Sequence, residues 1–388
     1  MLYLLKPGEL SLKGENRKDF ERVLKRNLKT MLGKTRSRIE MTHGRFYVEC
    51  AEDAERTVED ALGHLFGITG WAKTRSCEKT LDAVIHECVS EARELFSSGA
   101  KTFKIEAKRT DKSFPVDSYG IMNAAGEAIL TAMPEFTVDV HHPDALITVE
   151  IRESALIYGT SAKALGGLPV GTAGRGMLLL SGGIDSPVAG FMMAGRGMRM
   201  DAVYFHAYPY TPEESRQKVI KLAGIIGAYT MGIRVWTVNF TKIEMRIKEG
   251  APSEWTTILL RIAMMECAEG LARYRGAKCL ITGESLSQVA SQTIENIACT
   301  SSRVTLPILR PLIGMDKERI IRLAERIGTY ETSILPYQDC CVLFSPDHPM
   351  LRGKVTDAES LYRGLELEVL MHEAFTGAVM EKCGFYEE

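Results

Sequence analysis

The chain has 388 residues, of which 45% are hydrophobic and 25% are charged, and its formal net charge is −2 at pH 7. This balance is typical of a soluble globular protein, and no apolar run reaches the about 18 residues of a membrane span. The N-terminus lacks the charged region and long apolar core of a signal peptide. Nine cysteines without disulfide-framework spacing indicate reduced thiols. We therefore expect a cytoplasmic protein of two or three domains.

The first 55 residues have the pattern of a small α+β domain. Hydrophobic periodicity predicts a helix over 16–31 with a strongly basic face. The other predicted elements are a strand at 3–5, strands at 39–42 and 46–50, and a helix at 55–62. This βαββα order favours a ferredoxin-like domain, which we assign to residues 1–55. Residues 1–50 hold 12 Lys/Arg against 6 Asp/Glu, so the basic helix face is either an RNA contact or a solvated surface.

A second α/β unit is predicted for residues 56–165. Its elements are a helix at 81–96, a strand at 102–107, a helix within 116–133, and strands at 137–140 and 146–151. Basic side chains decorate one strand and the loop after it, namely Lys104, Lys108, Arg109 and Lys112. Such residues can neutralise phosphates, and the nearby Phe103 and Phe114 could support base stacking. The stretch resembles the Lys-Arg-x-Asp-Lys-Ser-Phe core of THUMP domains, and this resemblance implies that the four basic residues bind tRNA.

The most specific motif lies where a buried strand meets a glycine loop and a helix. The apolar run 177–180 suits a parallel strand covered on both faces. The small residues 181–183 let backbone N–H groups approach an anion closely. We expect Ser186 to be the N-cap of the following helix and Pro187 its first residue, so that the helix dipole favours a phosphate in the loop. The string Ser-Gly-Gly-Ile-Asp-Ser resembles the PP-loop of ATP pyrophosphatases, which adenylate a substrate and release pyrophosphate.

Strands then alternate with helices. The predicted strands are 201–205, 235–238 and 279–282, and the predicted helices begin at 188, 213 and 256. This alternation predicts a doubly wound parallel sheet with its site at the carboxyl ends of the strands. The segments 181–186, 205–206 and 283–284 all follow predicted strands, so we expect them to meet there. We assign residues 166–388 to this PP-loop ATP pyrophosphatase domain.

Further motifs extend one resemblance over the whole chain. They occur at 8–17, 166–172, 283–293, 309–312 and 335–341. With the THUMP and PP-loop motifs, they make the chain similar to the ThiI family of tRNA sulfurtransferases (tRNA 4-thiouridine synthases). The resemblance implies adenylation of uridine 8 in tRNA with ATP and Mg²⁺, followed by displacement of AMP by sulfur. It also implies a homodimer and, in many members, sulfur transfer through a small sulfur-carrier protein towards the thiazole of thiamine.

The resemblance also implies an ATP site. The matching positions are Leu179, Leu180, Ser181, Gly182, Gly183, Asp185, Ser186, Tyr204, Phe205, Arg261, Gly283 and Gln292. Asp185 is in addition our candidate catalytic carboxylate and Mg²⁺ ligand, since Mg²⁺ prefers oxygen ligands. Arg310 is a candidate phosphate contact. For Gln292 and Arg310 a purely structural hydrogen bond or salt bridge remains an alternative.

Sulfur delivery needs a thiolate or persulfide nucleophile. Cys341 matches the sulfur-handling cysteine of the family and is our candidate catalytic thiol, with its neighbour Cys340 as the alternative. Burial as two small core residues would explain the pair without catalysis.

Two expectations concern what the chain lacks. Many family members carry a C-terminal rhodanese-like domain, and the 388 residues leave no room for one, so sulfur is expected from a cysteine desulfurase, another persulfide donor or sulfide. No Cys-x-x-Cys pair occurs, and Cys267, Cys279 and Cys299 are scattered, so we do not expect an iron–sulfur cluster. The sequence leaves open whether Cys383 resolves a sulfur intermediate.

Two other functions remain alternatives. One is a different PP-loop tRNA thiolase, such as a 2-thiouridine synthase. The other is an RNA-binding module with a vestigial nucleotide site, although the intact PP-loop string at 181–186 argues against it.

Overall fold

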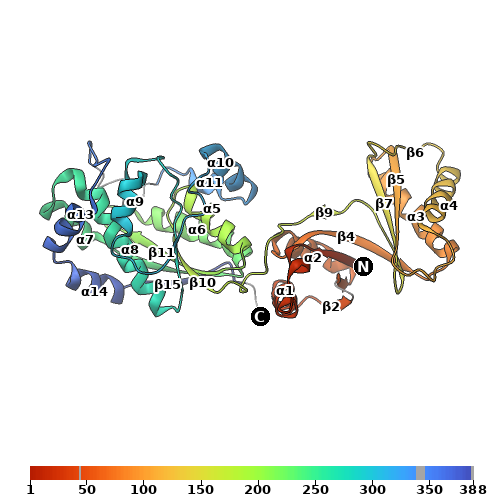
Figure 1. Cartoon of the computed structure of the whole chain (residues 1–388), viewed down its shortest axis with the longest axis horizontal. Helices are drawn as coiled ribbons and strands as arrows, with labels where there is room; N and C mark the ends of the chain where they lie inside the picture. Colours follow the sequence, from red (N-terminus) through yellow and green to blue (C-terminus); the bar gives the residue numbers. More distant parts are fainter. Residues whose placement is uncertain (43–44, 338–345, 386–388) are drawn as a thin grey trace. The chain divides into compact units, whose positions relative to one another are not determined.

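The computed structural model describes residues 1–42, 45–337 and 346–385 (Figure 1). The chain divides into two compact units. The first contains Met1–Glu21 and Leu32–Gly167, and the second contains Arg22–Met31 and Leu168–Glu388. Helix α1 (Arg17–Leu32) contributes residues to both units.

The first unit begins with a ferredoxin-like fold. Its strands lie in the order β2-β3-β1-β4 and span Ser37–Thr42, Arg45–Cys50, Leu2–Pro7 and Ile68–Cys77. Its helices are α1, α2 (Glu55–His64) and the short turns Glu9–Leu12 and Glu52–Ala54. Leu4, Val48 and Leu62 are fully buried, because alternate strand positions and one face of each amphipathic helix are apolar. The predicted ferredoxin-like element order is confirmed, and β4 is an additional strand that the sequence did not reveal.

The THUMP part of the first unit continues from the long strand β4. The sheet proceeds in the order β4-β8-β7-β5-β6, and a short strand β9 pairs with β4. The strands are β8 (Ala155–Tyr158), β7 (Ala145–Ile151), β5 (Thr102–Arg109), β6 (Thr137–Val138) and β9 (Ala162–Lys163). Helices α3 (Leu81–Ser97) and α4 (Ser118–Ala132) begin at the side-chain caps Thr80 and Asp117. Each cap accepts a backbone N–H that the helix itself cannot satisfy.

The second unit is built on a sheet in which the described residues form six strands, in the order β14-β13-β10-β11-β12-β15. These strands span Ile308–Leu309, Leu280–Ile281, Arg175–Leu179, Arg199–His206, Ile233–Asn239 and Val379–Cys383. The first five run parallel, as predicted, and β15 pairs antiparallel with β12 at the edge. Strand β11 is buried from Met200 onward, and the mostly apolar run 202–205 within it fits a strand covered on both faces.

Helices surround this sheet on the connections between its strands. They are α5 (Asp185–Gly195), α6 (Glu213–Thr230), α7 (Thr241–Gly250), α8 (Thr256–Tyr274), α9 (Ile294–Ser301), α10 (Lys317–Arg326), α11 (Tyr330–Ser333), α13 (Val355–Gly364) and α14 (Glu368–Thr376). Short turns lie at Ser253–Trp255 and Ala290–Gln292. Helix α8 packs against β10, β11 and β13, and α6 packs against β11, β12 and β15. Across the described residues, no helix combines the length and apolar character that crossing a membrane requires.

Candidate active site at the carboxyl ends of the parallel strands

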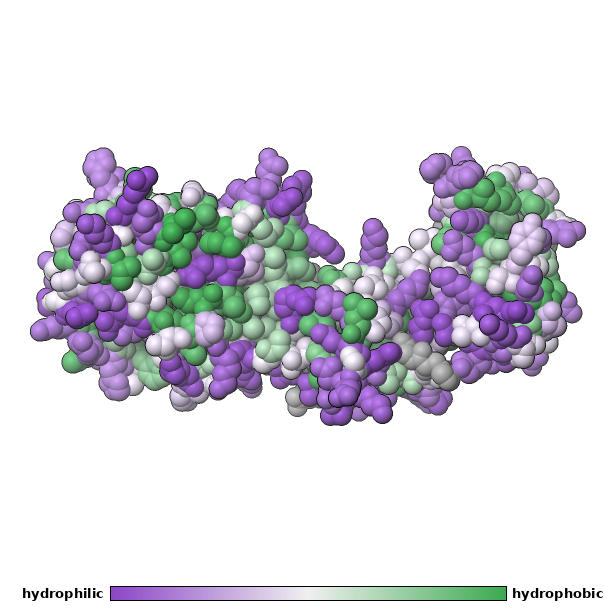
Figure 2. Space-filling view, viewed as in Figure 1, coloured by the Kyte–Doolittle hydropathy of each residue, from purple (hydrophilic) through white to green (hydrophobic). Residues whose placement is uncertain are grey.

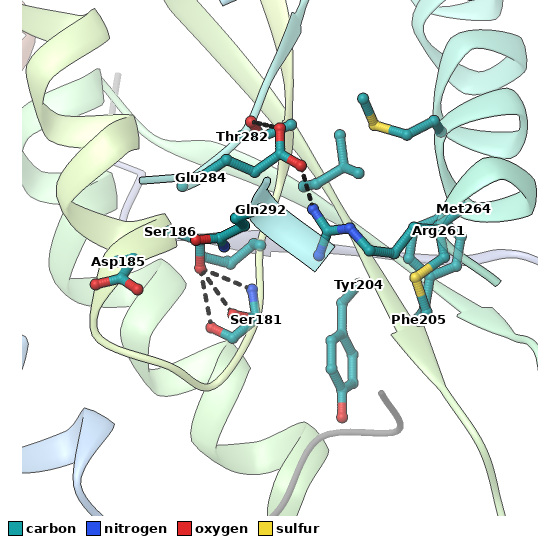
Figure 3. A pocket seen from close by; sticks show the side chains of 14 residues that line it. Ser181, Asp185, Ser186, Tyr204, Phe205, Arg261, Met264, Thr282, Glu284 and Gln292 are labelled. Carbon is teal, nitrogen blue, oxygen red and sulfur yellow. Dashed lines mark hydrogen bonds and ion pairs between the residues drawn. The ribbon is translucent and has the colours of Figure 1, made fainter. Parts of the chain in front are cut away.

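The PP-loop connects β10 to α5 and is closed by two serines. The Ser186 hydroxyl oxygen lies 2.9 Å from the Ser181 backbone nitrogen, which donates to it, and 3.1 Å from the Ser181 hydroxyl oxygen (Figure 3). The Ser181 hydroxyl in turn accepts the Gly183 N–H at 3.3 Å. These bonds hold the loop folded back on the start of the helix, where backbone donors and the dipole favour an anion.

The helix begins earlier than the sequence suggested. Asp185 is the first residue of α5 and Ile184 already has helical torsion angles, so the expectation that Ser186 is the N-cap is wrong. Pro187 is still tolerated, because the first four N–H groups of a helix have no partner within it. Ser186 instead uses its side chain to close the loop.

Gly283 brings the neighbouring strand end against this helix start. A Cβ at Gly283 would lie 2.7 Å from the Ser186 nitrogen and 2.8 Å from the Asp185 carbonyl carbon. No real Cβ approaches backbone that closely, so the end of β13 can pack on the PP-loop only if this residue is glycine.

A pocket of about 180 Å³ opens beside the loop. Its lining residues are Leu179, Leu180, Ser181, Asp185, Ser186, Tyr204, Phe205, Arg261, Met264, Met265, Thr282, Gly283, Glu284 and Gln292. Ten of the twelve residues in the expected ATP site line it, whereas Gly182 and Gly183 do not. The structure thus brings together residues from four separate stretches of the sequence.

One side of the pocket is apolar. Phe205 lies at the end of β11 and packs on Phe240 with ring centroids 4.7 Å apart. Met264 and Met265 follow Arg261 on α8 by three and four residues, so they share its face of the helix. Flat aromatic and polarizable thioether surfaces of this kind suit a planar base. Neither methionine was predicted from the sequence, although their helical spacing from Arg261 could have indicated them.

The polar floor of the pocket is organised by Glu284, whose side chain is 2% exposed. Its carboxylate accepts hydrogen bonds from Arg261 Nη2 and from the Thr282 hydroxyl at 2.9 Å (Figure 3). It also accepts one from Arg310 Nε at 2.7 Å. Burial acts to raise the pKa of Glu284, but the two guanidinium groups outweigh it and hold that pKa below its ordinary value. Glu284 therefore stays ionised and fixes both arginines.

Arg310 lies behind this carboxylate and does not line the pocket. Its second donor, Nη2, contacts the Ser301 hydroxyl at 2.7 Å. These partners are the structural alternative that the sequence left open for Arg310. A direct phosphate contact by this residue stays a prediction.

Asp185 carries the charge at the mouth of the loop. Its two oxygens contact Lys317 Nζ at 2.6 Å and Gln288 Nε2 at 2.9 Å. Lys317 is the first residue of α10, and 132 positions separate it from Asp185. Lys317 and Gln288 were not predicted from the sequence, because only the folded chain brings them to the PP-loop, whereas Glu284 lies in the segment 283–284 that was expected at this end of the sheet.

Cys340 and Cys341 lie outside the described residues. The cysteines that are described are Cys50, Cys77, Cys88, Cys267, Cys279, Cys299 and Cys383, and none is in a disulfide. Burial raises the pKa of each of these thiols, to about 12 for Cys267 and about 11 for Cys383. Such thiols are poorly ionised at neutral pH and are therefore poor nucleophiles.

The described residues contain no group of three or more His, Cys, Asp or Glu side chains that could hold a metal ion. At the PP-loop, Asp185 supplies a single carboxylate. One carboxylate is a fitting contribution for Mg²⁺ bound through substrate phosphates, since Mg²⁺ keeps several waters and takes few protein ligands.

The four basic residues expected to bind tRNA have different surroundings in the THUMP part. Lys104 pairs with Glu106 at 3.3 Å, and Lys112 is exposed. Arg109 donates to the carbonyl oxygens of Phe114 and Val116, so it holds the following loop. Lys108 lines a crevice of the first unit with Lys6, Pro7, Ser11, Arg45, Glu150 and Tyr158.

The expected stacking surface is absent from this stretch. Phe103 is 1% exposed and Phe114 is 4% exposed, and both belong to the hydrophobic core of the THUMP part. Neither ring is available to a base in this conformation. The bulk of these side chains therefore supports the fold and not RNA stacking.

Comparison with known families accounts for most of the chain. Residues 171–367 match the family described as "Thiamine biosynthesis protein (ThiI)". Residues 2–72 match the ThiI ferredoxin-like domain, and residues 78–158 match the THUMP domain. The chain belongs to the ThiI family. The expected boundaries at 55/56 and 165/166 stay a prediction.

ThiI-family relatives match over nearly their full length. A probable tRNA sulfurtransferase of Treponema pallidum (strain Nichols) is 48% identical over 376 residues, covering 96% of this chain and 94% of the relative. One of Caldanaerobacter subterraneus subsp. tengcongensis is 47% identical and covers 91% and 92%.

Solved structures show the same ThiI architecture. A crystal structure of a 4-thiouridine synthetase–RNA complex with bound ATP has a TM-score of 0.92 and 38% identity, and the match covers 98% of this chain and 99% of that one. The structure of PH1313 from Pyrococcus horikoshii has a TM-score of 0.64, 24% identity and coverage of 84% and 99%, and it supports the fold alone.

Proposed function

We propose that this chain is an ATP-dependent tRNA sulfurtransferase that converts uridine 8 of tRNA into 4-thiouridine. The observation that carries the proposal is the closed PP-loop beside a pocket that combines an apolar face with a polar floor, where Glu284 holds Arg261 in place. The similarity along the whole chain to a 4-thiouridine synthetase that was solved with RNA and ATP supports the same reaction.

The geometry suits adenylation of a carbonyl oxygen. Adenine would rest between Phe205 and the methionines of α8, and the triphosphate would extend towards the PP-loop. O4 of the uracil attacks the α-phosphorus, and pyrophosphate leaves towards the loop amides and the start of α5. The carbonyl oxygen, a poor leaving group, thereby becomes the bridging oxygen of an AMP ester. Positioning and charge neutralisation supply the catalysis, so no strong acid or base is needed.

Asp185 and Lys317 would both act at the phosphates of ATP. Lys317 places its ammonium 2.6 Å from the carboxylate and can move onto a phosphate oxygen when ATP enters. Asp185 would then be free to hold Mg²⁺ together with the phosphates. Bound Mg²⁺ supplies charge neutralisation of the pyrophosphate leaving group. Arg261, held by Glu284, faces the same pocket and would contact the nucleotide.

Sulfur transfer completes the reaction. Hydrosulfide adds to C4 of the adenylated uracil, and AMP departs. When the donor is a cysteine persulfide, its outer sulfur adds to C4, AMP departs, and a protein–uridine disulfide remains. A second thiol, from the protein or from an added reductant, then attacks the cysteine sulfur, so that 4-thiouridine leaves and a new disulfide forms. We assign the thiol that relays sulfur to Cys341, with Cys340 as the alternative. The described thiols support this choice, since burial raises the pKa of each and suppresses its thiolate. A cysteine desulfurase or another persulfide donor would load the relay, and a small sulfur-carrier protein for thiamine thiazole synthesis is a second acceptor. We propose a homodimer, as the family resemblance implies.

The test uses purified protein, ATP, Mg²⁺, unmodified tRNA transcript and sulfide. Digested tRNA is analysed by mass and by co-elution with authentic 4-thiouridine, because 2-thiouridine has the same mass. We expect 4-thiouridine at position 8 from wild type. Product that co-elutes with 2-thiouridine would instead assign the chain to the other PP-loop thiolases.

The cysteine assignment has its own comparison. Cys341→Ser is expected to keep activity with sulfide and to lose it with a desulfurase and cysteine, because only the second route needs a relay thiol. Cys340→Ser is expected to keep both activities. The reverse pattern would assign the relay to Cys340.

A further inference from the structure

The second unit has a crevice at the end of its sheet opposite to the nucleotide pocket. Arg175 is the first residue of β10, Arg199 is the first of β11 and Arg234 is the second of β12. Because these strands are parallel, their amino ends lie side by side at the same end of the sheet. The crevice has a volume of about 230 Å³ and is lined by Arg26, Thr30, Arg175, Arg199, Met200, Asp201, Thr230, Met231, Gly232, Arg234 and Phe385.

Positive charge is in excess there among the residues that the structure describes. Asp201 is the one acidic residue among the described residues that line the crevice, against four arginines. Its carboxylate, 2% exposed, is already engaged by Arg275 Nε at 2.8 Å and Arg175 Nη1 at 3.3 Å, with Arg234 at 3.8 Å. Arg26 and Arg199 form no ion pair with any described residue.

The two arginines that pair with no described carboxylate converge on one point. Gly171 has a φ of +100°, and a Cβ built there would lie 3.2 Å from Arg199 Nε and 3.6 Å from Arg26 Nη2. The glycine therefore leaves room for two guanidinium groups to approach the same place. The pKa of Arg199 is lowered, first by partial burial and then by Arg26, Arg175 and Arg234. Like charges held this close indicate a place where an anion would be stabilised.

The charge continues onto α1. The part of this helix that belongs to the second unit, Arg22–Met31, carries Arg22, Lys25, Arg26 and Lys29, all of them exposed. Spacings of three and four residues place these side chains on one face of the helix. Figure 2 shows hydrophilic side chains over α1. A basic surface longer than a single anion fits a run of phosphates along a nucleic-acid backbone better than one small ion.

We propose that the arginine crevice and the adjoining face of α1 bind backbone phosphates of tRNA, at a place separate from the nucleotide pocket. The identity of the RNA rests on the proposed function. Guanidinium groups bind phosphate oxygens through two parallel hydrogen bonds, so Arg26 and Arg199 can each clamp a phosphate. Such a contact does not distinguish one RNA base sequence from another. It increases the affinity for the tRNA without taking part in the reaction.

The test compares wild type with Arg26→Gln/Arg199→Gln. Binding of labelled unmodified tRNA transcript is measured by fluorescence anisotropy over a range of salt concentrations. Each lost phosphate contact lowers the slope of log K against log salt by about 0.9, so we expect a slope shallower by about one to two and binding about tenfold weaker at low salt. The melting temperature should not fall, because the substitutions remove two like charges that pair with no described carboxylate.

Two matched variants show whether charge at this place is what matters. Lys221→Gln removes an exposed lysine of α6 that does not line the crevice, and it should keep the wild-type slope. Arg199→Lys keeps the charge and should keep most of the slope while losing the two-pronged contact. A double arginine variant that binds tRNA like Lys221→Gln would overturn the proposal.

A small polyphosphate is the other source of the same chemistry. If tripolyphosphate raises the melting temperature of wild type more than that of the arginine variant, and the tRNA slope is unchanged, the crevice binds small polyphosphates and the RNA proposal fails.

The 4-thiouridine assay distinguishes failure of this proposal from failure of the proposed function. If the wild type makes no 4-thiouridine, but the double arginine variant has a shallower salt dependence of tRNA binding, the proposal for the crevice stands and the proposed enzyme function fails. If the double variant keeps both the wild-type slope and normal 4-thiouridine formation, the proposed enzyme function stands and the proposal for the crevice fails.

Discussion

Each end of the parallel sheet contains a buried carboxylate that forms ion pairs with several arginines, but the balance of charge differs between the two ends. At the carboxyl end, Glu284 and Asp185 hold Arg261, Arg310 and Lys317. At the amino end, Asp201 is the one acidic residue that the described part of the chain places among five arginines, when Arg275 is included. Cations fixed by carboxylates are placed in advance for a reaction. Cations in excess attract a polyanion without fixing its position.

This difference predicts how each end responds to substitution. Changes at the carboxyl end should alter stability or the rate of adenylation. Changes to Arg26 and Arg199, which pair with no described carboxylate at the amino end, should alter tRNA affinity alone.

The largest effect is expected from Glu284→Gln. The substitution keeps the size of the side chain but leaves Arg261 and Arg310 with no carboxylate in a buried site. Breaking a buried pair of this kind costs about 3–5 kcal/mol of unfolding free energy, to be measured by denaturant titration. Asp201→Asn is the matched control at the amino end. It should cost less, because its arginines are 25–30% exposed, compared with 16% and 23% for those of Glu284.

The same comparison has a pH dependence. The folded state holds the pKa of Glu284 below its ordinary value of 4.5, so its stabilisation is complete above that pH. The stabilisation is lost as the pH falls through the lower, folded-state pKa. Glu284→Gln should therefore be less stable than wild type at pH 7, and the difference should shrink in acid. A difference that stays constant down to the acid transition would contradict this account.

Asp185→Ala should come next. It removes the Asp185 carboxylate at the mouth of the PP-loop, and losing a preorganised charge at a reacting phosphate lowers the rate by about 10²–10³-fold. Pyrophosphate release in the presence of unmodified tRNA measures it. Asp316→Ala is the control, because Asp316 caps α10 next to Lys317 and does not line the pocket. Equal losses in both variants would mean that the position of α10, and not the carboxylate, matters.

Lys317→Met should have a smaller effect and separate rate from stability. Its side chain is 42% exposed, so we expect little change in melting temperature. The loss of a cation at the phosphates should lower adenylation about tenfold or more, mainly in kcat. An unchanged kcat with a raised KM for ATP would show that Lys317 contributes to binding alone.

The sequence predicted the parts of this molecule whose signal is local. The PP-loop string, the buried strands β10 and β11, and the amphipathic helix α1 each carry their pattern within a few turns or a short strand. Strand β15 was missed because it is an edge strand, with Val379 62% exposed and no alternation to mark it. Lys317 and Gln288 reach Asp185 only through the fold, from more than 100 residues away, so no spacing could have announced them.

The smallest effect is expected from Cys383→Ala. Cys383 lies buried on β15, and burial with the nearby Glu381 raises the pKa of its thiol to about 11. A thiol of this kind is almost entirely protonated at neutral pH, so it can neither accept nor resolve sulfur efficiently. The variant should make 4-thiouridine within about twofold of wild type with either sulfide or a desulfurase, at a stability cost of about 1 kcal/mol for the lost packing. A loss of activity restricted to the desulfurase route would show that β15 opens during sulfur transfer and that Cys383 is the resolving thiol after all.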